Sequence, residues 1–119
     1  MMHLYRITVA CSLDYKGEPL DWRETAPILD KFGDHLTREF GGCTILTGSG
    51  KWRGQQRGVT ESVCVFEVVT YDLPRERELM RNIVKKYATD LRQQSVLVTM
   101  QPVEVDWNWL DYTNTNEEA

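Results

Sequence analysis

The chain has 119 residues, of which 41% are hydrophobic and 27% charged, and these fractions are typical of one folded globular domain. The formal net charge of −4 argues against a nucleic-acid-binding surface, because phosphate contacts need clustered lysine and arginine. No apolar run reaches the roughly 18 residues of a membrane-spanning helix, and the first residues do not resemble a secretion signal, so we expect a cytoplasmic protein without a membrane partner.

The cysteines and histidines argue against a metal site. Cys11, Cys43 and Cys64 are odd in number and lack CxxC spacing, which predicts reduced thiols packed as small hydrophobic groups. His3 and His35 fall in different predicted elements, and neither has a second ligand at helical or hairpin spacing. We therefore expect no metal site.

The first third of the chain predicts a strand, a long connection and a helix. Residues 4–10 alternate between apolar and polar positions, as a half-buried strand does. Residues 12–20 form a polar connection that is long for a compact domain and could act as a cover. A helix is expected over 22–40, with Asp21 as its N-cap and Gly41 as its left-handed stop.

A β-hairpin is expected in the middle of the chain. Residues 43–47 predict a short strand that Gly48-Ser49-Gly50 ends, and residues 52–59 predict a polar loop. The next strand, expected over 60–70, is apolar on both faces, so something should cover each face.

The last third predicts a helix, a strand and a tail. Asp72-Leu73-Pro74 opens a helix whose buried stripe is formed by Leu79, Met80, Ile83, Val84, Tyr87 and Leu91. Residues 95–105 predict a final strand. The tail, 106–119, carries Trp107, Trp109 and Tyr112 before an acidic end.

The resulting order, β-α-β-β-α-β, predicts an α+β ferredoxin-like fold over residues 1–105, with both helices on one face of a four-stranded antiparallel sheet. The other face is then open although two of its strands carry apolar residues there. We expect another subunit or the aromatic tail to cover it, and we predict a homo-oligomer, either a dimer or a trimer.

Two carboxylates are the strongest candidates for a site. Glu61 and Glu67 are separated by an even number of residues in one strand, so they point to the same face, the one away from the helices. Near Trp52 at a subunit seam, such a carboxylate could hold a cationic ligand. The structural alternative is an intersubunit ion pair with Arg53 or Arg57.

Three motifs within residues 41–100 resemble a known family: Gly50-Lys51-Trp52-Arg53, Glu61 at the start of a strand, and Gln93-Gln94 before Ser95-Val96-Leu97-Val98. The set is similar to the small phage-encoded enzymes that degrade S-adenosylmethionine, the SAM lyases. That resemblance implies a ferredoxin-like homotrimer with the ligand between subunits. It also implies cleavage of S-adenosylmethionine to methylthioadenosine and homoserine lactone without a cofactor.

The resemblance also implies roles for individual residues. Glu61 would bind the ammonium group or the sulfonium charge of the substrate and would be the essential catalytic residue. Trp52 would pack against the adenine, and the backbone at Gly48 and Gly50 would approach the ligand closely. The expected substrate-binding set is completed by Arg53, Glu67 and Gln94.

The sequence departs from the family at two points, and other functions stay open. Trp52 stands where the family has a tyrosine, and the loop before Glu61 is slightly shorter. One alternative is an oligomer that binds a nucleotide-like metabolite without turnover, as a sensor or sequestering protein. Another is a protein-interaction module that uses a sheet edge or the aromatic tail.

Overall fold

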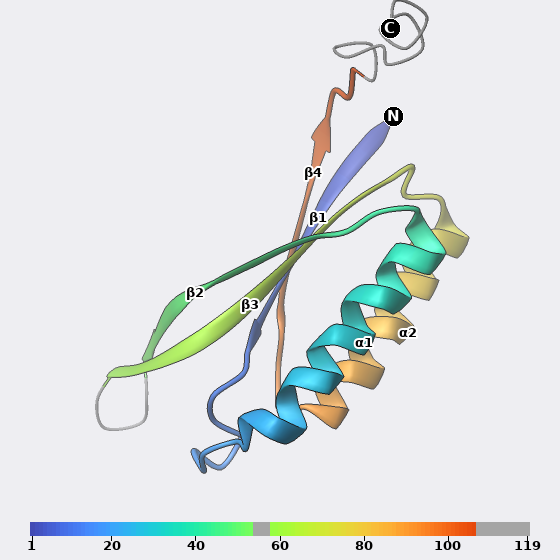
Figure 1. Ribbon diagram of the computed structural model, residues 1–119. Coiled ribbons are helices and arrows are strands. Elements are labelled where there is room, and N and C mark those ends of the chain that lie inside the picture. Colours follow the sequence, from blue (N-terminus) through green and yellow to red (C-terminus); the bar gives the residue numbers. More distant parts are fainter. Residues whose placement is uncertain (54–57, 107–119) are drawn as a thin grey trace, which may run out of the picture.

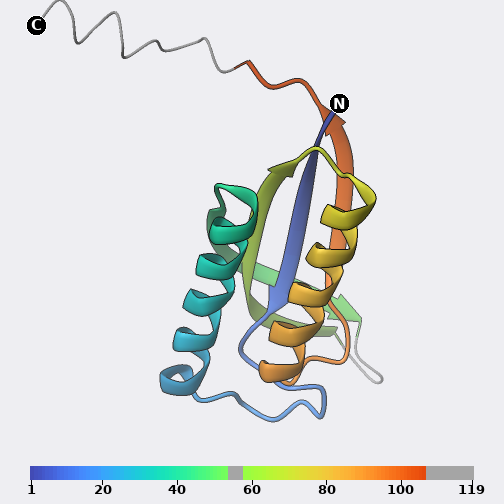
Figure 2. The same cartoon turned by 90° about the vertical axis from the view of Figure 1, so that its right-hand side faces the viewer.

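The computed structural model describes residues 1–53 and 58–106, and it has the predicted ferredoxin-like fold. In chain order the elements are β1 (Met2–Ala10), α1 (Trp22–Phe40), β2 (Thr44–Arg53), β3 (Gly58–Thr70), α2 (Pro74–Asp90) and β4 (Leu97–Val103). The antiparallel sheet has the strand order β2-β3-β1-β4, and both helices cover one of its faces (Figures 1 and 2). In this part of the chain no helix is long and apolar enough to cross a membrane.

The core lies between the helices and alternate residues of the two central strands. Ile7 of β1 and Phe66 of β3 are neighbours across the strands and have no exposed surface. Phe32 of α1 stacks on Phe66 and on Tyr87 of α2, with ring centroids 4.3 and 4.8 Å apart. Offset aromatic stacking adds to area burial, so these rings join both helices to the sheet. The predicted stripe of α2 is confirmed, since Met80, Ile83, Tyr87 and Leu91 are buried and Leu79 and Val84 pack against the core.

The helix ends follow the capping chemistry of the sequence. The Asp21 carboxylate accepts a hydrogen bond from the backbone N–H of Arg23 at 2.9 Å, as an N-cap does. Gly41 ends α1 with a φ of 88°, in the left-handed region that glycine adopts without strain. The Glu76 carboxylate accepts from the backbone N–H of Leu73 and so satisfies one donor at the start of α2.

The hairpin differs from the sequence-based prediction. Gly48-Ser49-Gly50 does not end β2, which continues through Trp52 to Arg53, and β3 begins two residues earlier than expected, at Gly58. The residues between the two strands, 54–57, lie outside the described part. The strands pair without interruption from Thr44–Glu67 to Arg53–Gly58, and neither Gly48 nor Gly50 adopts the positive φ that would turn the chain. The far end of this hairpin bends away from the helices (Figure 1).

The face of the sheet turned away from the helices, which we call the open face, carries exposed apolar side chains. Leu46 of β2 and Leu97 of β4 are 49% and 55% exposed, and Val65 of β3 is half-buried. Neither helix reaches this face (Figure 2). The aromatic tail that was predicted as a possible cover falls in residues 107–119, outside the described residues. The expected homo-oligomer thus stays a prediction, and the open face is where it would form.

A charged cluster holds the connection from β3 to α2. The Asp72 side chain is 4% exposed and accepts hydrogen bonds from the Tyr5 hydroxyl and the Arg77 guanidinium. The bond from Arg77, and then the one from Tyr5, lowers the pKa of Asp72 from 3.8 to about 2. The residue has a φ of 56°, which aspartate tolerates better than most residues.

Replacing Asp72 by asparagine is expected to destabilise the protein at neutral pH and to remove part of its acid sensitivity. A lowered native pKa stabilises the folded state above the unfolded-state pKa, and this contribution is lost as the pH falls through the native value. The difference in the free energy of unfolding between wild type and Asp72→Asn should therefore be largest above about pH 4 and shrink toward pH 2. Urea unfolding at several pH values measures it.

The matched control is Asp90→Asn, which breaks the exposed Lys86–Asp90 pair of α2. An exposed pair of this spacing contributes only about 0.3–0.5 kcal/mol. An equal stability difference at pH 7 and pH 2 for Asp72→Asn would contradict the proposed role of this carboxylate.

Candidate functional site

Three of the predicted residues meet on the open face near the far end of the hairpin. The β2–β3 register places Gly50 opposite Glu61, and Trp52 lies two residues further along β2, so all three share one face. The indole of Trp52 lies across Gly50: a Cβ atom built on Gly50 would be 2.7 Å from Cζ2 of that ring and 2.8 Å from a methyl group of Val63. Gly50 is thus required by the side chain that covers it.

A hollow of about 420 Å³ opens beside this indole, and we call it the Glu61 hollow. It is lined by Trp52 of β2, Glu61 of β3, and Gln93 and Gln94 of the connection between α2 and β4. It is also lined by Thr8 and Ala10 of β1, by Leu97 of β4, and by Asp14 and Tyr15. Five separate segments of the chain therefore contribute to one concave site that has both aromatic and acidic groups.

The Glu61 carboxylate is held in place by the backbone. Its Oε1 accepts a hydrogen bond from the backbone N–H of Leu13 at 3.0 Å. The side-chain amide of Gln93 donates to the carbonyl of Leu13 at 2.8 Å, and the backbone N–H of Tyr15 donates to the carbonyl of Arg92 at 2.9 Å. Because the same segment is bonded to both sides of the hollow, the carboxylate has a fixed orientation.

Tyr15, Asp14 and Gln93 were not among the predicted site residues. Tyr15 and Asp14 come from the long polar connection after β1, which the sequence marked only as a possible cover. Asp14 shapes that connection, since its carboxylate accepts from the backbone N–H groups of Lys16 and Glu18. The unusual length of this segment was the one signal in the sequence that pointed to it.

Other predicted residues lie elsewhere. Glu67 is six positions after Glu61 on the same face, and it accepts hydrogen bonds from the Arg6 guanidinium at 2.9 and 2.7 Å. It does not line the Glu61 hollow. Arg53 is exposed at the end of β2, and Gly48 lies opposite Val63. The structure thus brings Trp52, Glu61 and Gln94 together in one hollow and leaves Glu67 apart.

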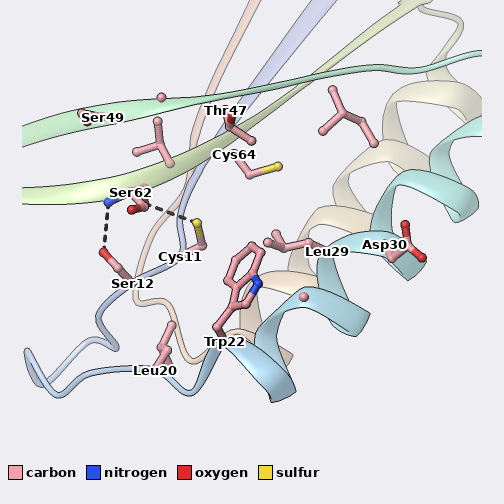
Figure 3. A pocket seen from close by; sticks show the side chains of 14 residues that line it. Cys11, Ser12, Leu20, Trp22, Leu29, Asp30, Thr47, Ser49, Ser62 and Cys64 are labelled. Carbon is pink, nitrogen blue, oxygen red and sulfur yellow. Dashed lines mark hydrogen bonds between the residues drawn. The ribbon is translucent and has the colours of Figure 1, made fainter.

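A larger hollow, of about 800 Å³, lies on the helix side of the sheet. Trp22 and Leu29 of α1 lie there opposite Ser62 and Cys64 of β3 (Figure 3). Burial raises the pKa of the Cys64 thiol to about 11. Since the thiolate is the nucleophilic form, Cys64 is a poor nucleophile, and the hollow offers packing more than chemistry.

The cysteines and the possible metal ligands were also located in the structure. All three cysteines are free thiols. Burial, and then the charge of Glu61, raises the pKa of Cys11. Within residues 1–53 and 58–106, no group of three histidine, cysteine or acidic side chains is arranged to hold a metal ion.

The fold and the site's position define a ferredoxin-like protein with a concave site on its open sheet face. The chain belongs to a family described as "Protein of unknown function (DUF3574)", whose sequence profile matches residues 31–107. This range includes Trp52, Glu61 and Gln94. A comparison with curated protein sequences finds no match.

Several solved structures share the fold. A phage SAM lyase in complex with S-methyl-5'-thioadenosine is 17% identical, with a TM-score of 0.60 over 92% of this chain and 93% of that one. A phage SAM lyase in the apo state is 20% identical, with a TM-score of 0.58 over 83% and 78%. The divalent cation tolerance protein CutA1 from Thermus thermophilus is 11% identical, with a TM-score of 0.58 over 98% and 93%. At these identities the likeness shows the fold alone.

Proposed function

We propose that this protein binds S-adenosylmethionine in the Glu61 hollow and cleaves it to methylthioadenosine and homoserine lactone. The observation that carries the proposal is the convergence of Trp52, Glu61 and Gln94, from three separate segments, on one hollow. The fold similarity to a phage SAM lyase that holds S-methyl-5'-thioadenosine, a product of this reaction, supports it.

The reaction needs no group that the site lacks. A carboxylate oxygen of the substrate attacks the γ-carbon of the same molecule, and the bond between that carbon and sulfur breaks. The electron pair of the broken bond stays on sulfur, which turns the sulfonium cation into a neutral thioether. No proton, water or oxidant enters the balance. The protein therefore has to hold the substrate bent with the reacting atoms close together, which makes catalysis a matter of positioning.

The arrangement of the hollow suits a cationic nucleoside. Oε1 of Glu61 is occupied by the Leu13 N–H, while among the described residues Oε2 has no hydrogen-bond partner. That second oxygen would accept from the substrate's ammonium group. The indole of Trp52 offers an aromatic face that attracts a sulfonium charge or stacks on adenine, and Gln94 offers an amide that can donate and accept.

The position of the hollow on the open face suggests that a second copy completes it. Exposed Leu46 and Leu97 lie on the same face, and burying them would favour association. A homotrimer, as in the resembled family, would place the ligand between subunits. A buried carboxylate at such a seam is costly unless a cation joins it, which the substrate supplies.

Binding without turnover is the second candidate, and Trp52 favours it. The resembled enzymes have a tyrosine at this position, and the indole offers a similar aromatic face without the hydroxyl group. A sequestering protein would keep intact S-adenosylmethionine through purification.

Incubation with S-adenosylmethionine and mass spectrometry distinguishes the two candidates. We expect methylthioadenosine and homoserine lactone to form faster than in a control without protein, which corrects for the compound's spontaneous decay. Intact substrate at high protein concentration would refute the lyase proposal, and intact substrate that copurifies with the protein would support sequestration.

A further inference from the structure

A second hollow with a different character lies between α2 and β4, and we call it the α2–β4 groove. It has a volume of about 350 Å³ and an apolar floor formed by Met80, Val84, Val98 and Met100. Val98 and Met100 stay 40% and 42% exposed there, although they point to the helix side of the sheet. An apolar floor of this kind would be stabilised by a further apolar group.

The rim of the α2–β4 groove is basic. Arg77, Arg81 and Lys85 follow one another at spacings of four residues on α2, so they lie on one helix face above the floor. Arg77 is paired with Asp72. Within the described residues, no salt bridge joins Arg81 or Lys85 to a carboxylate. The groove therefore fits an occupant with apolar and acidic groups.

Two other hollows in the described part of the chain have acidic side chains in their lining. Near the start of β1, a hollow of about 550 Å³ is lined by Glu39, Glu67 and Glu76. The large hollow beside Trp22 has Asp30 in its lining. An acidic, aromatic segment would be repelled from these carboxylates and attracted to the α2–β4 groove.

The chain itself has such a segment directly after β4. Residues 107–112 read Trp-Asn-Trp-Leu-Asp-Tyr, and Glu117 and Glu118 follow without any basic residue. The strand β4 ends at Val103, at the end of the sheet where α2 begins (Figure 2). The 13 residues after Asp106 can span about 43–47 Å when extended, and the seven residues of β4 span about 23 Å.

We propose that residues 107–119 fold back into the α2–β4 groove of their own chain, with indole rings on the Met80 and Met100 floor and acidic groups toward Arg81 and Lys85. Because the segment is tethered a few residues from the groove, its effective concentration there is high, and this favours its own chain over a neighbour. The docking is separate from the Glu61 hollow, which lies on the opposite face of the sheet.

Methionine methyl groups report on the docking directly. The chain has four methionines, and two of them, Met80 and Met100, form the groove floor, while Met1 is 84% exposed and serves as an internal reference. In full-length protein labelled at the methionine methyls, indole ring currents should displace the Met80 and Met100 signals. Trp107→Ala combined with Trp109→Ala should return both signals toward ordinary positions. Unchanged signals would overturn the proposal.

Charge reversal and a mixing experiment complete the test. Arg81→Glu combined with Lys85→Glu should move the Met80 and Met100 signals in the same direction as the double tryptophan variant does, toward ordinary positions. Arg38→Glu on α1 should leave both signals where they are in the wild type. Labelled chains that carry Trp107→Ala and Trp109→Ala are then refolded together with unlabelled wild-type chains. The Met80 and Met100 signals of the labelled chains should stay where they are in the variant alone. Their return to wild-type positions would mean that a neighbour supplies the tail and would overturn docking within one chain.

Discussion

Replacing Glu61 by glutamine is expected to slow turnover of S-adenosylmethionine strongly and to leave the fold and the oligomeric state unchanged. The amide oxygen of glutamine still accepts from the Leu13 N–H, so the local structure keeps its hydrogen bond. The charge that would face the substrate's ammonium group is lost. Removing one partner of a desolvated charge pair costs about 2–5 kcal/mol, so kcat/KM should fall roughly thirty-fold to several thousand-fold.

The control for Glu61→Gln is Glu39→Gln, which removes a carboxylate near the end of α1, outside the Glu61 hollow. Its kcat/KM should match the wild type. Analytical ultracentrifugation of each variant gives the oligomeric state, and product formation gives the rate. If Glu61→Gln instead separates the subunits, Glu61 acts as part of the seam and the lyase proposal loses its main residue. If Glu61→Gln changes neither kcat/KM nor the oligomeric state, the Glu61 carboxylate has no role in the reaction.

The fold could be predicted from the sequence because its signals are local. Apolar residues recur at helical spacing between Ile28 and Phe40, and together with the Asp21 cap and the Gly41 stop they predict α1 from neighbouring residues alone. The alternation in β1 does the same for the central strand. Element order then leaves few arrangements, and the ferredoxin-like sheet is the one observed.

The extent of β2 could not be read from the same signals. Glycines at positions 48 and 50 and the polar residues after Trp52 predicted a turn, because glycine is typical of turns. Here pairing with β3 overrides that local preference. Position 50 requires glycine because the indole of Trp52 lies across it and leaves no room for a Cβ atom. Such a requirement depends on a side chain two residues away and leaves no trace in local propensity.

The candidate site was only partly predictable for a related reason. The alternation of side chains along β3 placed Glu61 on the open face, but it placed Glu67 there as well and could not distinguish the two residues. Their different surroundings come from β1 and its following connection: Arg6 pairs with Glu67, and Leu13 binds Glu61. These partners are 61 and 48 positions away in sequence, so spacing rules do not reach them.

Gly50→Ala and Gly48→Ala should have opposite effects on stability, although the two residues are neighbours on one face of β2. A Cβ at position 50 would lie 2.7 Å from the Trp52 ring and 2.8 Å from Val63, closer than non-bonded carbon atoms approach. Crowding of this kind typically costs about 1–3 kcal/mol, and we expect Gly50→Ala to lower the free energy of unfolding by that amount.

At position 48 the nearest atom to a built Cβ is a methyl group of Val63 at 3.9 Å, an ordinary contact. Neither glycine has a positive φ, so alanine fits the backbone at both positions. By restricting the unfolded chain, Gly48→Ala should therefore raise the free energy of unfolding by about 0.4–1 kcal/mol. Urea unfolding followed by circular dichroism measures both.

The same pair of variants tests the role of the indole in binding. If Trp52 stacks on the nucleoside of the ligand, moving its ring by Gly50→Ala should weaken the affinity for methylthioadenosine about five- to 150-fold, since base–aromatic stacking contributes roughly 1–3 kcal/mol. Calorimetric titration of the folded variant measures this loss. If Gly50→Ala lowers the stability but leaves the affinity unchanged, the ring covers Gly50 without touching the ligand. Aromatic contact would then have to come from Tyr15, which also lines the hollow.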